Sequence, residues 1–462
     1  MNIDGQKLRS MVIEVLQELQ QDTAGDGVFS CMDEAVKAAK KAYEQLSLLS
    51  IEKREKLIAA MRRAVLDNLE ELSRLALEET GMGRYEDKLV KNRLAAVKTP
   101  GTEDICPRAY TGDHGLTLVE RAAYGVIGAI TPSTNPSESI ICNGIGMLAA
   151  GNSVVFNPHP GAVMVSTMTV KILNRAIVAA GGPPDLLTCP KKPDALTGQI
   201  LMKHPYIRML VVTGGPEIVR IAMHSGKKVI AAGPGNPPVV VDATADIEKA
   251  ARDITDGASF DNNILCISEK EVFCEDAVFD RLKEEMKRSG AFEISLGQLA
   301  KVMEQITVKR EGGIYINKRF VGKDAAYILK HADIEMPPDK KLVIAEVGAD
   351  HPLVYLEQLM PVLPMVRAAD VDEAIEMAAA AEQGNFHTAH MHSRNVENLS
   401  KMARRIDTSI FVKNGPSYAG LGAQGEGFTT YTIASPTGEG LTSPITFTRQ
   451  RRCVLKDQFR IV

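Results

Sequence analysis

The amino-acid sequence predicts an α/β fold in which a doubly wound parallel sheet is followed by a second α/β domain. Between residues 126 and 224, short apolar segments of strand length alternate with segments of helix length. Residues 233–238 then form a turn-rich hinge, and the apolar triplet 239–241 opens a second α/β pattern. Such alternation is typical of parallel sheets, because two parallel strands need a crossover connection that is usually a helix.

The segments of the first sheet are assigned in chain order. We expect strands at 126–130, 154–156, 186–187 and 209–212, and helices at 137–149, 163–180, 194–202 and 217–224. Ligands bind beyond the carboxyl ends of the strands in such sheets, so the loops 130–135 and 212–216 are candidate ligand loops. Residues 144–149 match the pattern Gly-x-Gly-x-x-Ala, but they lie inside a helix instead of on the turn after a strand. We interpret these glycines as sites of close helix packing.

The chain before residue 126 is predicted to hold helices and one hairpin. Residues 6–20 have an apolar stripe opposite charged residues, and residues 20–27 form a polar linker. A helix this short is marginal alone, so its stripe must pack on its own domain or on a partner. Residues 32–80 follow a helical pattern, with Ser50 as an N-cap and glycines 81 and 83 as the stop. Residues 108–122 have the pattern of a β-hairpin.

Composition narrows the function classes. The 462 residues include 54 basic and 58 acidic ones without a block of like charge, which argues against nucleic acid as a partner. No uninterrupted apolar run reaches the about 18 residues of a membrane span, and the first residues lack the order of a secretory signal. The seven cysteines form no CxxC pair, so we expect reduced thiols in a soluble cytoplasmic protein. The histidines at 387, 390 and 392 lack acidic or cysteine neighbours, so we expect no metal.

Cys266 is the candidate nucleophile. It follows the side-chain amides of Asn262 and Asn263, and the chain becomes charged again at residues 268–270. A thiolate attacks carbonyl groups far better than a hydroxyl does. Because a lone cysteine is more often a small buried side chain, Cys266 alone leaves a core role open. At the other end of the chain, residues 445–462 are β-like and basic, and would pair with a neighbouring subunit or with an edge of their own domain.

Together these features resemble the aldehyde dehydrogenase superfamily from about residue 30 to the end. The resemblance rests on segments 130–136, 213–218 and 357–362 and on Cys266, in the family's order and spacing. It implies that Cys266 is the nucleophile and Asn135 the catalytic asparagine, which holds an oxyanion together with the Cys266 backbone N–H. It also implies that NAD is bound, with Glu357 on the nicotinamide ribose. The other implied cofactor-binding residues are Thr131, Pro132, Ser133, Asn157, Thr213, Gly214 and Gly215.

The resemblance divides the chain into four parts. Residues 1–22 would be a targeting helix with its linker, and residues 28–235 the NAD-binding domain with the hairpin as an excursion. Residues 236–427 would form the catalytic domain, and residues 428–462 a β segment for oligomerisation into a dimer or tetramer.

This chain departs from the family pattern in two places, and the first departure points to the CoA-acylating branch. Relatives that release free acids carry a glutamate in the segment that corresponds to 230–238, and this chain has no acid or base there. Water needs a base, whereas a thiol is partly ionised near neutral pH, so a thioester on Cys266 should survive until CoA takes the acyl group. A base from another segment remains the alternative. Asn157 and Pro160 replace a lysine and a glutamate that grip the adenosine ribose, so the choice between NAD and NADP stays open.

Within that branch, the N-terminal helix resembles the extension of propionaldehyde and acetaldehyde dehydrogenases of bacterial microcompartments. The resemblance implies that the helix binds a shell or cargo protein and that the substrate is an aldehyde of two to four carbons. Two other functions remain open. The chain could be an NADPH-dependent reductase of an acyl phosphate, or a packaging protein without catalytic activity.

Overall fold

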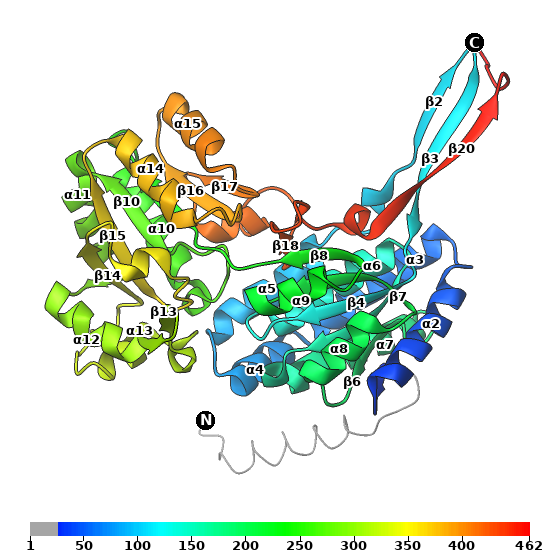
Figure 1. Cartoon of the computed structure of the whole chain (residues 1–462), viewed down its shortest axis with the longest axis horizontal. Coiled ribbons are helices and arrows are strands. Elements are labelled where there is room, and N and C mark those ends of the chain that lie inside the picture. Colours follow the sequence, from blue (N-terminus) through cyan, green and yellow to red (C-terminus); the bar gives the residue numbers. More distant parts are fainter. Residues whose placement is uncertain (1–25) are drawn as a thin grey trace.

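Residues 26–462 are described by the computed structural model, which contains two parallel sheets side by side and a smaller sheet that projects from them (Figure 1). The first sheet has six strands in the order β1-β6-β5-β4-β7-β8, all parallel. These strands are β1 (Val28–Phe29), β4 (Val126–Thr131), β5 (Ser153–Pro158), β6 (Leu187–Pro190), β7 (Ile207–Thr213) and β8 (Lys228–Ala232). The four predicted strands are present, and β1 and β8 extend the sheet at its edges.

Helices cover both faces of the first sheet, as a doubly wound sheet requires. Ile127 and Ala129 of β4 pack on one face, while Val126 and Ile130 pack on the other, because successive side chains of a strand alternate. The first face carries α3 (Ile51–Asp67), α6 (Pro136–Ala149) and α7 (Val163–Ala179), and the second carries α2 (Met32–Leu46), α8 (Ala195–Lys203) and α9 (Pro216–Met223). The glycines at 144 and 146 lie in α6 against Leu187 and Phe447, so their packing role is confirmed.

The predicted helical region 32–80 consists of three helices, α2, α3 and α4 (Leu69–Thr80). Ser50 caps α3 by accepting a hydrogen bond from the Lys53 backbone N–H at 3.2 Å, as predicted. Gly81 ends α4 with a left-handed φ of 62°. A further helix, α5 (Tyr85–Lys98), was not predicted; it packs between α3, α4 and α6.

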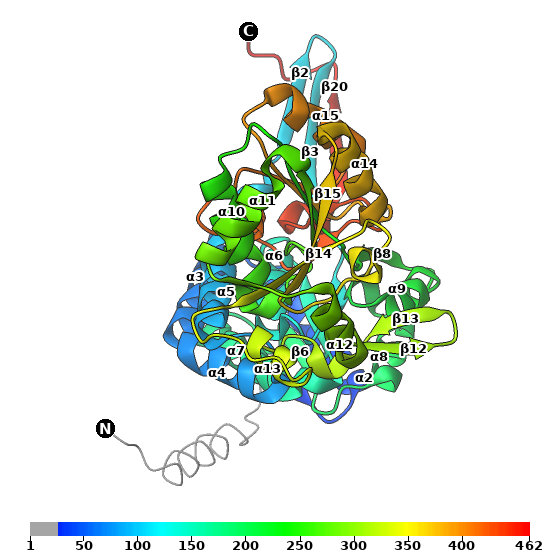
Figure 2. The ribbon, with the colours of Figure 1, turned by 90° about the vertical axis from the view of Figure 1, so that its left-hand side faces the viewer.

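The second sheet has seven parallel strands in the order β11-β14-β15-β10-β9-β16-β17. Helices α10 (Ile247–Ser259) and α11 (Asp276–Arg288) cover one face. The other face carries α12 (Leu296–Ile306), α13 (Ala325–Lys330), α14 (Val371–Glu382) and α15 (Val396–Ile406) (Figure 2). The strands are β9 (Pro238–Val241), β10 (Glu271–Glu275), β11 (Ala291–Glu293), β14 (Leu342–Val347), β15 (Val362–Ala368), β16 (Thr388–His392) and β17 (Ile410–Lys413), and a hairpin joins β12 (Thr307–Arg310) to β13 (Gly313–Ile316). The α/β fold class with two wound sheets is confirmed.

Residues 233–237 lead directly from β8 in the first sheet to β9 in the second, where the sequence predicted a hinge. The chain returns to the first sheet near its end. Tyr431, Phe447 and strand β18 (Ile433–Ala434), which pairs with β19 (Gly440–Leu441), pack in the same core as α6.

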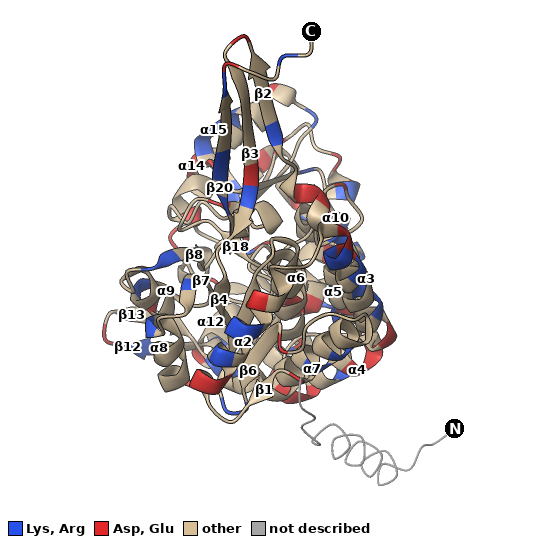
Figure 3. Ribbon diagram, turned by 90° about the vertical axis from the view of Figure 1, so that its right-hand side faces the viewer, with Lys and Arg blue, Asp and Glu red and all other residues tan. Residues whose placement is uncertain are grey.

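The projecting sheet consists of the predicted hairpin, β2 (Arg108–Gly112) and β3 (Gly115–Ala123), together with β20 (Thr448–Lys456). Strand β20 pairs antiparallel with β3 of the same chain from Thr448 to Lys456, so the C-terminal strand extends a sheet of its own chain. The side chains of β2 and β20 are mostly exposed, and β20 carries several basic residues (Figure 3).

Residues 160–179, which include α7, are long and apolar enough to resemble a membrane helix. Because most of this segment is buried inside the fold, it is better explained as a core helix. Within residues 26–462 no three histidine, cysteine or acidic side chains are grouped as a metal site would need. The predicted helix at 6–20 lies outside the described residues.

Candidate active site

Cys266 lies in a loop between α10 and β10 whose backbone is held in an uncommon conformation. The three residues Asp261, Asn262 and Asn263 have φ angles of 46°, 53° and 63°. A left-handed conformation costs most residues about 1–2 kcal/mol each, and is tolerated best by asparagine and aspartate among non-glycine residues. Their side chains also offset the cost locally: Asn262 donates to the Gly322 carbonyl at 2.9 Å, and Asn263 donates to the Ala258 carbonyl at 2.8 Å. The side-chain amides of Asn262 and Asn263 therefore stabilise the backbone conformation of the loop that carries Cys266.

The thiol of Cys266 is partly exposed and packs against the core of the first sheet. Burial raises the pKa of Cys266 to about 12, the Glu357 carboxylate adds to the rise, and the Lys270 ammonium opposes it. The resting side chain is therefore a protonated thiol, because the surrounding protein disfavours the thiolate. A positive charge brought to the site with a ligand would lower this pKa.

Lys270 is fully buried beneath the nucleophile loop and was missed by the sequence interpretation. Its ammonium donates to the carbonyl oxygens of Asn263 at 3.0 Å and Leu265 at 3.2 Å, and also to the Asn263 side chain. Burial lowers the pKa of Lys270 to about 8, while Glu357 and Cys266 counteract this effect. A lysine directly before a buried strand was the signal that could have pointed to this role.

Asn135 is the N-cap of α6 and is only 6% exposed. Its side-chain nitrogen donates to the Thr134 hydroxyl at 3.2 Å, and its amide oxygen has no partner among the described residues. One amide N–H therefore remains free to bind an oxyanion. The loop before it begins at Thr131, the last residue of β4, and runs through Pro132 and Ser133.

The loops predicted to bind the cofactor lie at the switch point of the first sheet. Strands β4 and β7 are neighbours, and the chain proceeds from β4 to β5 and β6 on one side and from β7 to β8 on the other. Such a switch point leaves a crevice at the carboxyl ends of the strands, where nucleotides bind. Thr131 ends β4 and Thr213 ends β7. Both predicted loops therefore begin at the edge of the sheet where ligands bind in folds of this kind.

The residues after Thr213 suit a pyrophosphate. Gly214 and Gly215 lead into α9, whose N-terminus presents unpaired backbone N–H groups and a partial positive charge. Gly215 is exposed, and a Cβ added to it would meet no atom within 4 Å, so the backbone is open to a ligand. The half-buried Glu357 accepts the backbone N–H of Gly235. Burial raises the pKa of Glu357, and Lys270 opposes the rise.

Asn157, in β5, has a different environment from the other predicted cofactor residues. Its amide oxygen accepts from the Thr197 hydroxyl at 2.7 Å, and its amide nitrogen donates to the Asp194 carbonyl at 3.2 Å. Asp194 and Thr197 form the capping box of α8. These bonds leave one amide N–H and one lone pair for a ligand, and a cofactor role for Asn157 stays a prediction.

His387 also reaches the site and was missed because the sequence interpretation treated it only as a metal ligand. Its ring packs on Gly235, where an added Cβ would lie 2.9 Å from the ring Cγ and 2.8 Å from the Cys266 carbonyl oxygen. Burial lowers the pKa of His387 to about 4, so the ring is neutral at pH 7, and its Nε2 has no partner among the described residues. Segment 230–238 itself contributes no acid or base, but the neutral imidazole of His387 packs against its Gly235.

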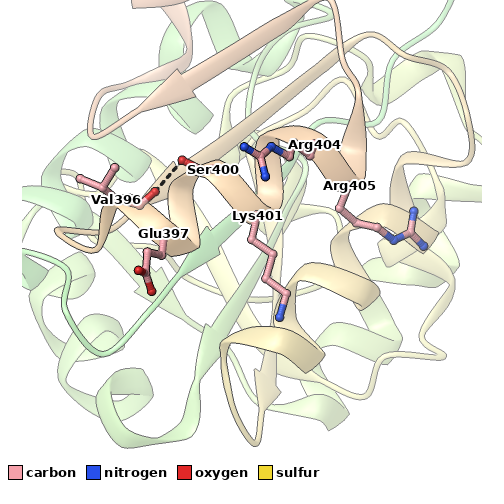
Figure 4. A pocket seen from close by; sticks show the side chains of 6 residues that line it. All are labelled: Val396, Glu397, Ser400, Lys401, Arg404 and Arg405. Carbon is pink, nitrogen blue, oxygen red and sulfur yellow. Dashed lines mark hydrogen bonds between the residues drawn. The ribbon is translucent and has the colours of Figure 1, made fainter.

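A surface hollow on α15 is unrelated to these residues. It is lined by Val396, Glu397, Ser400, Lys401, Arg404 and Arg405, all from α15 (Figure 4). Arg405 pairs with Glu376 at 2.8 Å, and Lys401 pairs with Asp372. Two of its three cations are thus already neutralised.

Comparison with known proteins agrees with this geometry. The model of the aldehyde dehydrogenase family matches residues 14–427, and the chain belongs to this family. An acetaldehyde dehydrogenase (acetylating) of Bilophila wadsworthia is 48% identical over 486 residues, with 100% of both chains covered.

Two solved structures have the same fold at high sequence identity. The propionaldehyde dehydrogenase of Rhodopseudomonas palustris, with bound CoA and an acylated cysteine, is 51% identical. Its TM-score is 0.91, with 94% of this chain and 98% of that chain covered. A propionaldehyde dehydrogenase from the fucose utilisation bacterial microcompartment of Clostridium phytofermentans is 49% identical, with a TM-score of 0.92 and coverage of 94% and 100%.

Proposed function

We propose that this protein is a CoA-acylating aldehyde dehydrogenase, which converts a short aldehyde, NAD⁺ and CoA into an acyl-CoA and NADH. The observation that carries the proposal is the close approach of Gly235 to the Cys266 backbone, where a Cβ added to the glycine would lie 2.8 Å from the Cys266 carbonyl oxygen. The segment that lies against the nucleophile is the one in which acid-releasing relatives carry their glutamate, and here it holds glycine and proline. The relative with bound CoA and an acylated cysteine supports the same acceptor.

Each residue of the site has a separate role in the first half-reaction. Cys266 releases its thiol proton to solvent, and its sulfur adds to the aldehyde carbonyl carbon, which leaves a hemithioacetal oxyanion. The free N–H of Asn135 and the backbone N–H of Cys266 hold this oxyanion, and act where charge develops. The nicotinamide would supply the hydride acceptor when bound; Glu357 would hold its ribose, and residues 213–215 would bind its pyrophosphate. Loss of hydride leaves a thioester on the Cys266 sulfur.

In the second half-reaction, the CoA thiolate attacks the thioester carbonyl and the Cys266 sulfur leaves. A thiol acceptor needs less assistance than water, because part of it is ionised near neutral pH. The imidazole of His387 packs on Gly235, but its pKa of about 4 makes it a weak base toward either a thiol or water. The acceptor must therefore be tested directly.

The test is NADH formation from propionaldehyde by the full chain, with and without CoA, together with assays for propionyl-CoA and propionate. We expect sustained NADH formation with CoA, and a single turnover per active site without it. Steady propionate release without CoA would refute CoA as the acceptor. Replacing CoA and NAD⁺ by an acyl phosphate and NADPH tests the reductase alternative. Activity of wild type together with a folded but inactive Cys266→Ala variant would refute the alternative that the chain is a packaging protein without catalytic activity.

We further propose that residues 1–22 direct the enzyme into a bacterial microcompartment by binding a shell or cargo protein. The microcompartment origin of one relative supports this destination. Deletion of residues 1–22 should leave the kinetics in solution unchanged while a fluorescent fusion disperses from purified compartments. Lost activity after the deletion would instead assign the segment to the enzyme domain.

The projecting sheet is proposed as the oligomerisation surface of a dimer or tetramer. Tyr110, Val454 and Leu455 expose apolar side chains on β2 and β20, and a lone three-stranded sheet has little to stabilise it. Light scattering should report an oligomer for the full chain and a smaller species for a variant with Val454→Lys and Leu455→Glu. An unchanged mass would assign the oligomer to another surface.

A further inference from the structure

Four charged side chains are buried together between α5, α6 and the nucleophile loop, and the proposed mechanism uses none of them. Lys88, Lys91, Glu138 and Asp261 are each at most 1% exposed. Lys91 lies in the middle: its Nζ is 2.6 Å from Asp261 Oδ2 and 3.2 Å from Glu138 Oε1. The same ammonium donates to the Thr134 carbonyl oxygen at 3.5 Å.

These contacts join the two loops that carry the reactive groups. Thr134 directly precedes Asn135, and Glu138 lies in the first turn of α6, which Asn135 caps. Asp261 begins the left-handed run that leads to Cys266. A single ammonium therefore bridges the loop of the oxyanion donor, which follows β4 of the first sheet, and the loop of the nucleophile, which precedes β10 of the second sheet.

Asp261 is in turn fixed by the beginning of α5. Its Oδ1 accepts the backbone N–H of Arg84 at 2.7 Å, and its own N–H donates to Asp87 Oδ2 at 2.8 Å. Gly83 has a φ of 81°, and a Cβ added to it would lie 1.9 Å from Asp261 Oδ1. The close approach of the two chain segments thus depends on glycine at position 83, which the sequence had suggested only as a helix stop.

The charge states agree with a paired arrangement. Burial alone would lower the pKa of Lys91, but Asp261 and Glu138 outweigh it and raise this pKa. Burial would raise the pKa of Asp261, and the two lysines outweigh that effect. A buried ion pair is a weak source of stability, because apolar side chains of similar volume often serve a fold as well or better. Its directional contacts, by contrast, set the geometry of the groups it joins.

We propose that Lys91 and Asp261 are positioning residues, which hold the Cys266 loop in register with the Asn135 loop so that the sulfur and the oxyanion donor meet the same carbonyl group. The inference rests on the proposed roles of Cys266 and Asn135. A displacement of about 1 Å between reacting groups can lower a rate by about 100-fold. Loss of the pair should consequently slow formation of the thioester more than it weakens cofactor binding.

The test compares Asp261→Asn, Lys91→Met and the double variant with wild type in the full-length protein. The first measurement is the rate of the NADH burst after mixing with NAD⁺ and propionaldehyde without CoA, and the second is Tm. Each single variant leaves one buried charge unpaired, so both the burst rate and Tm should fall, the rate by about 10- to 100-fold. The KM for NAD⁺ should stay within about twofold. The double variant restores the net charge of the cluster but leaves Lys88 and Glu138 without their ion-pair partners, so its Tm should lie above those of the single variants while its burst rate stays low.

Lys88→Met is the matched control, since Lys88 pairs with Asp261 at 3.4 Å but has no ion pair or hydrogen bond with Thr134 or Glu138 among the described residues. Its burst rate should stay within about threefold of wild type even if Tm falls. A burst rate that recovers with Tm in the double variant, or a double variant that does not fold, would assign the pair to the core and overturn the proposal. The Cys266→Ala variant separates a failure of the positioning proposal from a failure of the proposed function. A burst that survives this change would refute the proposed function itself.

Discussion

The Lys270 ammonium donates a hydrogen bond to the carbonyl oxygen of Leu265 at 3.2 Å, one residue before Cys266. A buried cation therefore lies beneath the loop of a thiol whose own environment disfavours ionisation. The interaction is electrostatic as well as structural, because Lys270 is among the groups that lower the pKa of Cys266. Catalysis must overcome the remaining rise in this pKa when the ligands bind.

Lys270→Met should make Cys266 less reactive. Loss of the ammonium removes a group that favours the thiolate, so the pH profile of Cys266 alkylation should move to higher pH. For every pH unit by which the profile moves, the alkylation rate at pH 7 should fall about tenfold. Iodoacetamide labelling of the Cys266 peptide, followed by mass spectrometry between pH 6 and 10, measures this. Lys401→Met, on the exposed face of α15, serves as the control. An unchanged profile would limit Lys270 to holding the loop.

Glu269→Gln should change the pH dependence of stability. Burial raises the pKa of Glu269 to about 7 from an ordinary value of 4.5, and its Oε1 accepts the Ser417 backbone N–H at 2.8 Å. Between pH 4.5 and 7 the folded protein binds more protons than the unfolded chain, so this group costs stability as pH rises. Because glutamine has no such cost, the Tm of the variant minus that of wild type should increase from pH 5 to pH 7 and then level off.

The exposed substitution Glu311→Gln provides the baseline for that comparison. The largest effect expected from Glu269 is about 1.4 kcal/mol per pH unit within the window. A Tm difference that is independent of pH would show that Glu269 stays ionised in the fold.

Gly235→Ala should disrupt the site without unfolding the sheets. The new Cβ would lie 2.8 Å from the Cys266 carbonyl oxygen, which is a backbone atom, and 2.9 Å from Cγ of His387, whose ring is fully buried, so neither group has room to move. We expect kcat to fall by about 100-fold, because the nucleophile must shift. Gly297→Ala in α12 is the matched control, since its Cβ would meet no atom within 4 Å. Full activity of Gly235→Ala would mean that the loop of Cys266 is not held tightly.

Asn157→Ala distinguishes a direct cofactor contact from an indirect one. The change removes the bonds to Asp194 and Thr197 together with any contact to the adenosine ribose. Thr197→Val removes the bond to the Asn157 oxygen while leaving the amide in place. If Asn157 binds the ribose, its alanine variant should raise the KM for NAD⁺ about tenfold with kcat unchanged, and the valine variant should have a smaller effect. Equal effects would mean that Asn157 acts through α8.

The sequence alone determined the features that depend on local pattern. Strands β4 to β7 and the helices between them follow from the alternation of apolar segments, and the caps at Ser50 and Gly81 follow from residue chemistry within one turn. The loops after β4 and β7 were found because parallel strands place their carboxyl ends at one edge of a sheet. The prediction for residues 32–80 was less accurate, because it treated three helices as one helical region. The breaks between these helices are short and leave the spacing of the apolar residues nearly intact.

Only the tertiary structure decided what surrounds Cys266. Lys91, Lys270 and His387 come from three separate segments, and the sequence contains no signal for which of its many titratable residues will meet. Their protonation follows from burial, which acts on a group only once the chain has closed around it. The partner of the C-terminal strand was equally undecided, because an edge strand offers the same backbone hydrogen bonds to any neighbour, and β3 of the same chain takes them here.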